Sequence, residues 1–181
     1  MSHHLDHTIA LLERTPGALD ELLRRLPPEW TDRNEGGDSW SPREIVAHLS
    51  HGERADWIPR VKHLLEFGET QPFPSFDREG QRKEMEGKSL AGLLDEFARL
   101  RAASLDELCA LSLGLAEMER RGVHPALGPV TLSELLATWA AHDLTHLHQM
   151  SRVMAHQYRE SVGPWSRFLG VMHCDGHSSS A

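Results

Sequence analysis

Apolar residues recur every three or four positions along four stretches of the chain, and this spacing is typical of amphipathic α-helices. We find no convincing alternation of apolar and polar residues, the pattern that indicates half-buried strands. The predicted helices span about residues 5–26, 41–68, 90–113 and 131–160. The pattern therefore predicts an all-α fold.

Local signals mark where these helices begin and bend. Ser41 and Glu44 have the spacing of a capping box, in which each side chain accepts a hydrogen bond from the other's backbone N–H, and the fourth helix starts with the same spacing. Pro59 predicts a kink in the second helix, because proline has no N–H to donate. Thr15 and Pro16 leave two interpretations of the first helix open, as two short helices or as one kinked helix.

A segment of about 20 residues between the second and third helices is rich in proline, glycine and charge, and it shows no strong periodicity. A connection of that length is usually a crossover or a functional loop. These features together predict a four-helix bundle with a long crossover. We expect a single domain, residues 1–181, with its core at about 5–174 and a short C-terminal helix in "GPWSRFLGVM".

Composition narrows the classes of protein that fit. The net charge of −8 argues against nucleic acid as a partner, because phosphate binding needs a basic surface. No apolar run approaches the roughly 18 residues that a membrane span needs. The N-terminus lacks the segments of a secretion signal, so we expect a cytoplasmic protein that acts on a small-molecule substrate. The two cysteines form no CxxC metal motif, whereas histidine is abundant, at 13 residues.

Two of these histidines face inward on the fourth helix. At about 100° per residue, His146 lies about 40° from the centre of the apolar stripe, and His142 lies about 80° from it. Their i, i+4 spacing lets both imidazoles reach one point. Asp143 and Gln149 also face inward, whereas His148 is predicted to face water. The pair fits either two hydrogen-bonded core histidines or two metal ligands.

The second helix supplies a third inward histidine. His48 lies on its apolar stripe, whereas His51 is expected at the stripe edge or in solvent. Gly52 removes a side chain from the same face, either to make room for a metal or substrate or to allow close helix packing. The zinc-protease motif HExxH shares the spacing of His142 and the second histidine of "HDLTH", but it needs Glu beside the first. Asp143 is one methylene shorter, so we reject a protease.

Three neutral imidazoles leave positions open on a metal, which resembles a catalytic rather than a closed structural zinc site. Nitrogen donors also suit other divalent transition metals, and zinc and nickel are the first candidates. The predicted ligands are His48, His142 and His146. Asp143 and Gln149 are candidates to orient a ligand or the substrate.

Four segments, "WSPREIVAHLSHGE", "PFPSFDREG", "GPVTLSELLATWAAHDLTHLHQM" and "PWSRFLGVMHC", together resemble the DinB-like (DinB/YfiT) superfamily over about residues 7–174. The resemblance implies a four-helix bundle with a crossover, a homodimer, and a metal site made by the same three histidines. It also implies either an S-transferase that uses a low-molecular-weight thiol or a metal-dependent hydrolase. A non-catalytic bundle that binds a metal or a small ligand is the alternative from another class.

Overall fold

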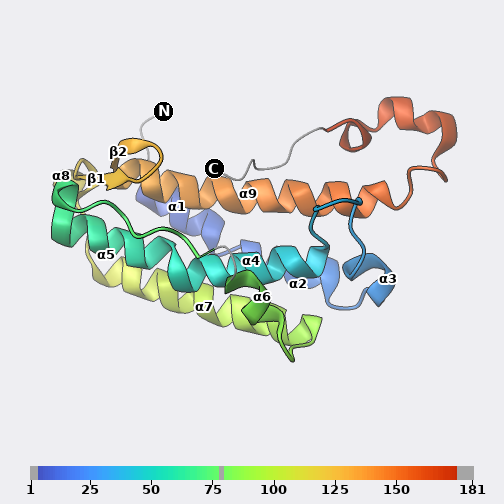
Figure 1. The fold of residues 1–181 in the computed structure, drawn as a ribbon, viewed down its shortest axis with the longest axis horizontal. Helices are drawn as coiled ribbons and strands as arrows, with labels where there is room; N and C mark the ends of the chain where they lie inside the picture. The colour runs from blue at the N-terminus through green and yellow to red at the C-terminus, as the bar shows by residue number, and fades with distance from the viewer. Residues whose placement is uncertain (1–3, 78–79, 175–181) are drawn as a thin grey trace.

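Four helical rods run side by side along the long axis of the protein (Figure 1), seen in a computed structural model that describes residues 4–77 and 80–174. The first rod is α1 followed by α2, the second is α4 followed by α5, and α7 and α9 are the other two. Their bounds are α1 Leu5–Leu12, α2 Thr15–Leu23, α4 Pro42–Ala55, α5 Trp57–Phe67, α7 Leu90–Ala110 and α9 Leu132–His156. This arrangement confirms the predicted four-helix bundle.

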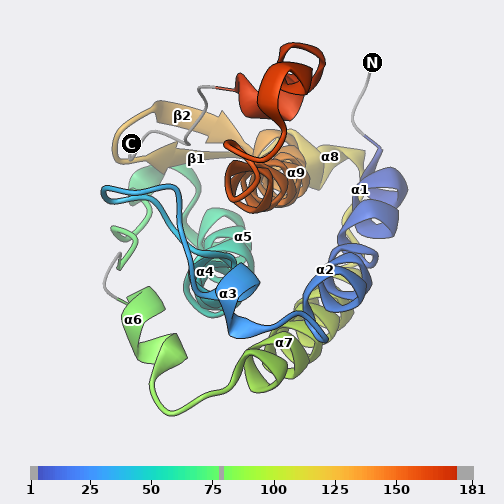
Figure 2. The same cartoon turned by 90° about the vertical axis from the view of Figure 1, so that its right-hand side faces the viewer.

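The rods form a ring when the bundle is viewed from its end (Figure 2). Helix α9 contacts α1, α4 and α5, and helix α7 contacts α2, α4 and α5. The remaining elements are α3 Pro28–Thr31, η1 Gly68–Thr70, α6 Gly80–Met85, α8 Leu115–Met118, η2 Gly163–Phe168 and η3 Gly170–Met172. Helix α6 lies within the crossover from α5 to α7 and packs against α4. The predicted C-terminal helix is thus two short 3-10 helices.

Both predicted capping boxes are present, and they begin the two helices that carry the candidate ligands. At α4, Ser41 N–H donates to Glu44 over 2.7 Å, and the Ser41 hydroxyl accepts from Glu44 N–H. At α9, Thr131 N–H donates to Glu134 over 2.7 Å, and the hydroxyl accepts in return. These caps fix where each helix starts, and so they fix which residues face inward.

The second predicted helix is broken rather than kinked. Helix α4 ends at Ala55, and α5 begins at Trp57. The break lies one turn before Pro59, whose ring would clash with the carbonyl of Ala55 and which has no N–H to bond it. Gly68 ends α5 as predicted, with a φ of 56° that other residues adopt at a cost.

A short hairpin corrects the expectation that the chain has no strands. Strands β1 Arg121–His124 and β2 Gly128–Thr131 pair antiparallel beside the start of α9. Phe73 N–H in the crossover donates to Val123 O over 2.8 Å, which ties the crossover to the hairpin edge. Four-residue strands are too short for an alternation of apolar and polar positions to stand out.

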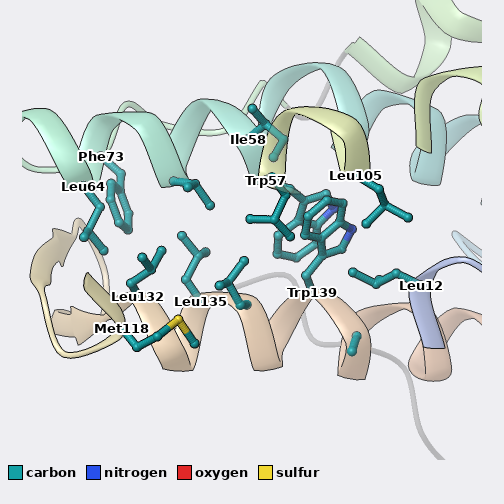
Figure 3. Packing of buried hydrophobic residues seen from close by; sticks show 14 residues of the cluster. Leu12, Trp57, Ile58, Leu64, Phe73, Leu105, Met118, Leu132, Leu135 and Trp139 are labelled. Carbon is teal, nitrogen blue, oxygen red and sulfur yellow. The ribbon is translucent and has the colours of Figure 1, made fainter. Parts of the chain in front are cut away.

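The core has two apolar clusters along the bundle. One contains Trp57 and Trp139, whose rings stack with centroids 5.7 Å apart, and it includes residues of α1, α5, α7 and α9 (Figure 3). The other is built around Phe97 and includes residues of α2, α4, α7 and α9. Between them along α4, α7 and α9 lie buried polar residues that include Glu53, Arg101 and Asp143. Of the helices in the described residues, none is long and apolar enough to cross a bilayer.

Candidate metal centre

Three histidines from two helices meet beside this polar layer. His48 projects from α4, and His142 and His146 project from adjacent turns of α9. The Nε2 atom of His142 lies 3.1 Å from Nε2 of His48 and 3.0 Å from Nε2 of His146. One ring nitrogen of each residue lies within 4.8 Å of the other two. The structure therefore brings together the three residues that the sequence predicts as ligands.

The three nitrogens are arranged to receive a cation. His146 Nδ1 lies 2.8 Å from Gln149 Oε1, an oxygen that can only accept, so the ring proton of neutral His146 sits on Nδ1. Its Nε2 then offers a lone pair towards His142. Zinc–imidazole bonds are about 2.0–2.1 Å long, so nitrogens about 3 Å apart can share one ion. The residues present fit a divalent transition metal.

Neighbouring groups hold each ring in place by a different contact. Gln149 accepts from His146, and the side chain of Gln81 in α6 hydrogen-bonds to His48. Among the described residues, no group pairs with His142 Nδ1. That ring instead packs edge-on against Trp57, with centroids 5.1 Å apart. Outer-sphere contacts of this kind usually orient metal ligands.

All three imidazoles are held in the neutral form that metal binding requires. Burial, together with the neighbouring His146, lowers the pKa of His48 to about 3. Burial and the other two histidines lower the pKa of His142 to about 2. Burial also lowers the pKa of His146, although its hydrogen bond to Gln149 opposes the shift. A protein with these pKa values needs no proton release from the ligands before it binds a metal near neutral pH.

The lowered pKa values predict how the metal-free protein responds to acid. Between the unfolded pKa of about 6.5 and the lower folded values, the unfolded chain binds more protons, so stability falls with falling pH. We expect the contribution of the neutral imidazoles to the free energy of unfolding to be complete above pH 6.5 and to be lost progressively below it. His142→Gln should show a slope shallower by up to about 1.4 kcal/mol per pH unit in urea unfolding. Equal slopes for the wild type and this variant would contradict the assignment, and exposed His148→Ala is the control.

A buried ionic network lies between the apolar clusters. Arg101 of α7 is 1% exposed, and its guanidinium binds carboxylates from two other helices. It donates to Asp143 over 2.6 and 3.0 Å and to Glu53 over 2.8 and 3.0 Å. It also donates to Leu12 O over 2.9 Å, and Trp139 Nε1 donates to Glu53 over 3.1 Å. Arg101 therefore joins all four rods of the bundle.

The network shifts the pKa values of Arg101 and Glu53. Burial would lower the pKa of Arg101, but hydrogen bonds to Asp143 and attraction to Glu53 outweigh it and raise the pKa. Burial raises the pKa of Glu53, because one guanidinium shared with Asp143 offsets only part of its desolvation. Arg101 thus stays charged, and both carboxylates accept hydrogen bonds from it.

Several predicted roles change in the structure. The sequence predicts Asp143 as a partner of a ligand or substrate, but its carboxylate binds Arg101 instead. Gln149, a candidate to orient a ligand or the substrate, accepts a hydrogen bond from the ring of His146. His51 is buried, not exposed, because the crossover covers it. His148 is exposed, as predicted.

The structure also answers a question that the sequence left open. A Cβ on Gly52 would lie 3.2 Å from Trp57 Nε1, so this glycine makes room for the packed indole of Trp57. Sequence reasoning missed Gln81 and Arg101. An inward Asp143 in need of a buried cation was the signal that could have indicated Arg101.

Comparisons with known proteins agree with this arrangement. A profile of the DinB superfamily matches residues 11–150. The chain belongs to the DinB superfamily. The match spans all three histidines of this DinB-superfamily chain and most of the bundle.

A similar solved structure supports the same fold. It is YfiT from Bacillus subtilis, described as a probable metal-dependent hydrolase with an unusual four-helix bundle topology. The TM-score is 0.65 at 20% sequence identity, covering 94% of this DinB-superfamily chain and 90% of YfiT. No curated protein matched the chain.

Proposed function

We propose that this protein is a metal-dependent enzyme whose ion is bound by His48, His142 and His146. The observation that carries the proposal is the convergence of three Nε2 atoms, with 3.1 and 3.0 Å between His142 and the other two. Depressed pKa values keep the imidazoles available as ligands. An all-nitrogen donor set suits zinc or nickel.

The side chains around the ion have distinct tasks. Gln149 and Gln81 orient His146 and His48, and Trp57 packs against His142. The nearby carboxylates of Glu53 and Asp143 both accept hydrogen bonds from Arg101. A divalent ion held by three imidazoles supplies Lewis acidity, which lowers the pKa of a water or thiol that enters the site. The nucleophile therefore comes from outside the chain.

We propose a low-molecular-weight thiol as that nucleophile and a small electrophile as the second substrate, which makes the protein an S-transferase. The thiol sulfur forms a bond to carbon, the leaving group departs with its electron pair, and the thiol proton passes to solvent. This chemistry needs no protein base, in keeping with the pairing of both carboxylates to Arg101. A metal-dependent hydrolase is the second candidate, favoured by the description of YfiT.

One assay separates these reactions. Metal-loaded protein is mixed with an activated aryl chloride, with and without a bacterial low-molecular-weight thiol, and separately with a nitrophenyl ester. We expect faster consumption of the aryl chloride only when thiol and metal are both present, and loss of this gain in His146→Ala. The exposed His148→Ala variant should keep it.

The opposite results are equally informative. Thiol-independent cleavage of the ester, lost in His146→Ala, would replace the transferase with the hydrolase. Stoichiometric metal binding with no turnover across a broad panel would make the protein a non-catalytic metal-binding bundle.

A further inference from the structure

A fourth histidine is buried one turn after His48 and lies outside the metal trio. His51 is 8% exposed, and its Nε2 lies 2.6 Å from Asp77 O in the crossover. A carbonyl oxygen only accepts, so His51 Nε2–H donates. The ring also packs against Phe76, with centroids 4.9 Å apart. His51 therefore attaches the crossover to α4 beside the candidate metal centre.

Glycine at position 80 fits this attachment closely. A Cβ built on Gly80 would lie 2.0 Å from His51 Cε1 and 2.4 Å from Nε2. Carbon atoms in contact are normally about 3.5–4.0 Å apart, so no larger residue fits while His51 keeps its place. Gly80 is the first residue of helix α6, a backbone conformation that other residues also adopt, so the conformation alone does not require glycine. The requirement comes from His51.

The same part of the crossover contacts His48. The Phe76 ring meets the His48 ring edge-on, at 6.2 Å between centroids. Gln81, next to Gly80, donates from Nε2 to Glu44 O over 3.1 Å, and its side chain also hydrogen-bonds to His48. Two crossover residues, Phe76 and Gln81, thus contact the predicted ligand His48.

Helix α6 has a second attachment that does not involve His51. Glu84 binds Arg54 of α4 over 2.8 Å and Lys88 over 3.1 Å. Loss of His51 should therefore free the part of the crossover around Phe76 and Asp77 without unfolding the bundle.

We propose that His51 is a positioning residue: it clamps the crossover onto α4 so that Phe76 and Gln81 hold His48 in its metal-binding orientation. The proposal rests on the proposed metal site for its effect on affinity. Its structural half, the attachment of the crossover, stands on the contacts of His51 alone.

The first test replaces His51 and measures two quantities. Hydrogen–deuterium exchange of metal-free protein should rise around Phe76 and Asp77 in His51→Ala. Affinity for Co²⁺, followed by its visible absorption, should fall about tenfold or more, the range for lost outer-sphere contacts. His51→Gln keeps an N–H donor, so it should restore most of the Co²⁺ affinity and most of the protection from exchange. Loss of a generic packing residue would not explain that recovery.

His63→Ala is the matched control. The Nε2 of His63 also lies near a crossover carbonyl, Gln71 O at 3.1 Å, but its ring packs against Phe67 and Phe73 and not against the trio. It should leave Co²⁺ affinity and spectrum unchanged. A fall as large as that of His51→Ala would mean that any loosening of the crossover disturbs the site, and it would overturn the specific role of His51.

The second test uses Gly80. Introduced into the wild-type protein, Gly80→Ala should cause the same loss of Co²⁺ affinity as His51→Ala, because the new methyl displaces the imidazole. In a His51→Ala background the methyl has room, so the double variant should bind Co²⁺ no more weakly than His51→Ala. Additive losses would overturn the proposal, since residues that act through one contact are not additive.

The two proposals can fail separately. If wild-type protein does not bind Co²⁺, the metal site is wrong, and exchange in the metal-free protein still decides whether His51 holds the crossover. If the wild type binds Co²⁺ but His51→Ala matches it in both affinity and exchange, the role of His51 is wrong and the metal site stands.

Discussion

Replacing His48, His142 or His146 by Ala is expected to lower the affinity for Zn²⁺ or Ni²⁺ by more than about a hundredfold, above the loss typical of outer-sphere changes. Each replacement removes one of three Nε2 donors that lie around a common point. The measurements are metal content after dialysis and competition with a chelator. Circular dichroism should show that the helices persist.

His148→Ala is the control, because this histidine lies on the same helix but is exposed. It should keep full metal stoichiometry. Retention of full stoichiometry in all three of the other variants would refute the centre. A loss confined to His142 and His146 would place the third donor elsewhere than on α4.

The ligand trio could be predicted because helical periodicity sets side-chain direction. In α9 the capping box fixes the start of the helix, so the positions of His142 and His146 relative to the apolar stripe follow from their numbers. The same reasoning placed His48 on the inner face of α4. What periodicity could not supply was the register of α4 against α9, and the structure shows that this register brings the three rings together.

His51 shows where this reasoning stops. Its position on the helical wheel, about 120° from the centre of the apolar stripe, predicts a place at the stripe edge or in solvent. The crossover covers that face through Asp77 and Gly80, and nothing in the local sequence of α4 indicates which distant segment will lie there. The hairpin was missed for a related reason, since its edge is completed by Phe73 of the crossover.

Arg101 was missed because arginine side chains usually lie at the protein surface. Helical periodicity places it on the apolar stripe of α7, one turn after Phe97 and one turn before Leu105. Its burial depends on Glu53 and Asp143, which lie 48 and 42 residues away in sequence. The inward Asp143 implies a buried cation beside it, and this is the inference that the sequence did allow.

Arg101→Met is expected to destabilise the protein by about 3–5 kcal/mol, the usual cost of removing one partner from a buried ion pair. The variant leaves Glu53 and Asp143 buried without their cation, and it removes the bond to Leu12 O that holds α1. The measurement is urea unfolding of metal-free protein near neutral pH. Arg99→Met, which removes an exposed partner of Glu96, should cost about 1 kcal/mol or less.

A pH series separates this cause from a simple loss of packing. The pKa of Glu53 is already raised by burial, and loss of Arg101 removes the attraction that opposes the rise. Above the unfolded pKa of about 4.3, a glutamate with a raised folded pKa binds more protons in the folded state, so stability falls as pH rises. The deficit of Arg101→Met should therefore be smaller at acidic pH than at neutral pH.

Adding Glu53→Gln and Asp143→Asn to Arg101→Met should recover part of the stability, because the uncompensated charges are gone. A deficit that is constant with pH, and that these two changes enlarge, would show that Arg101 acts through its shape and not through its charge.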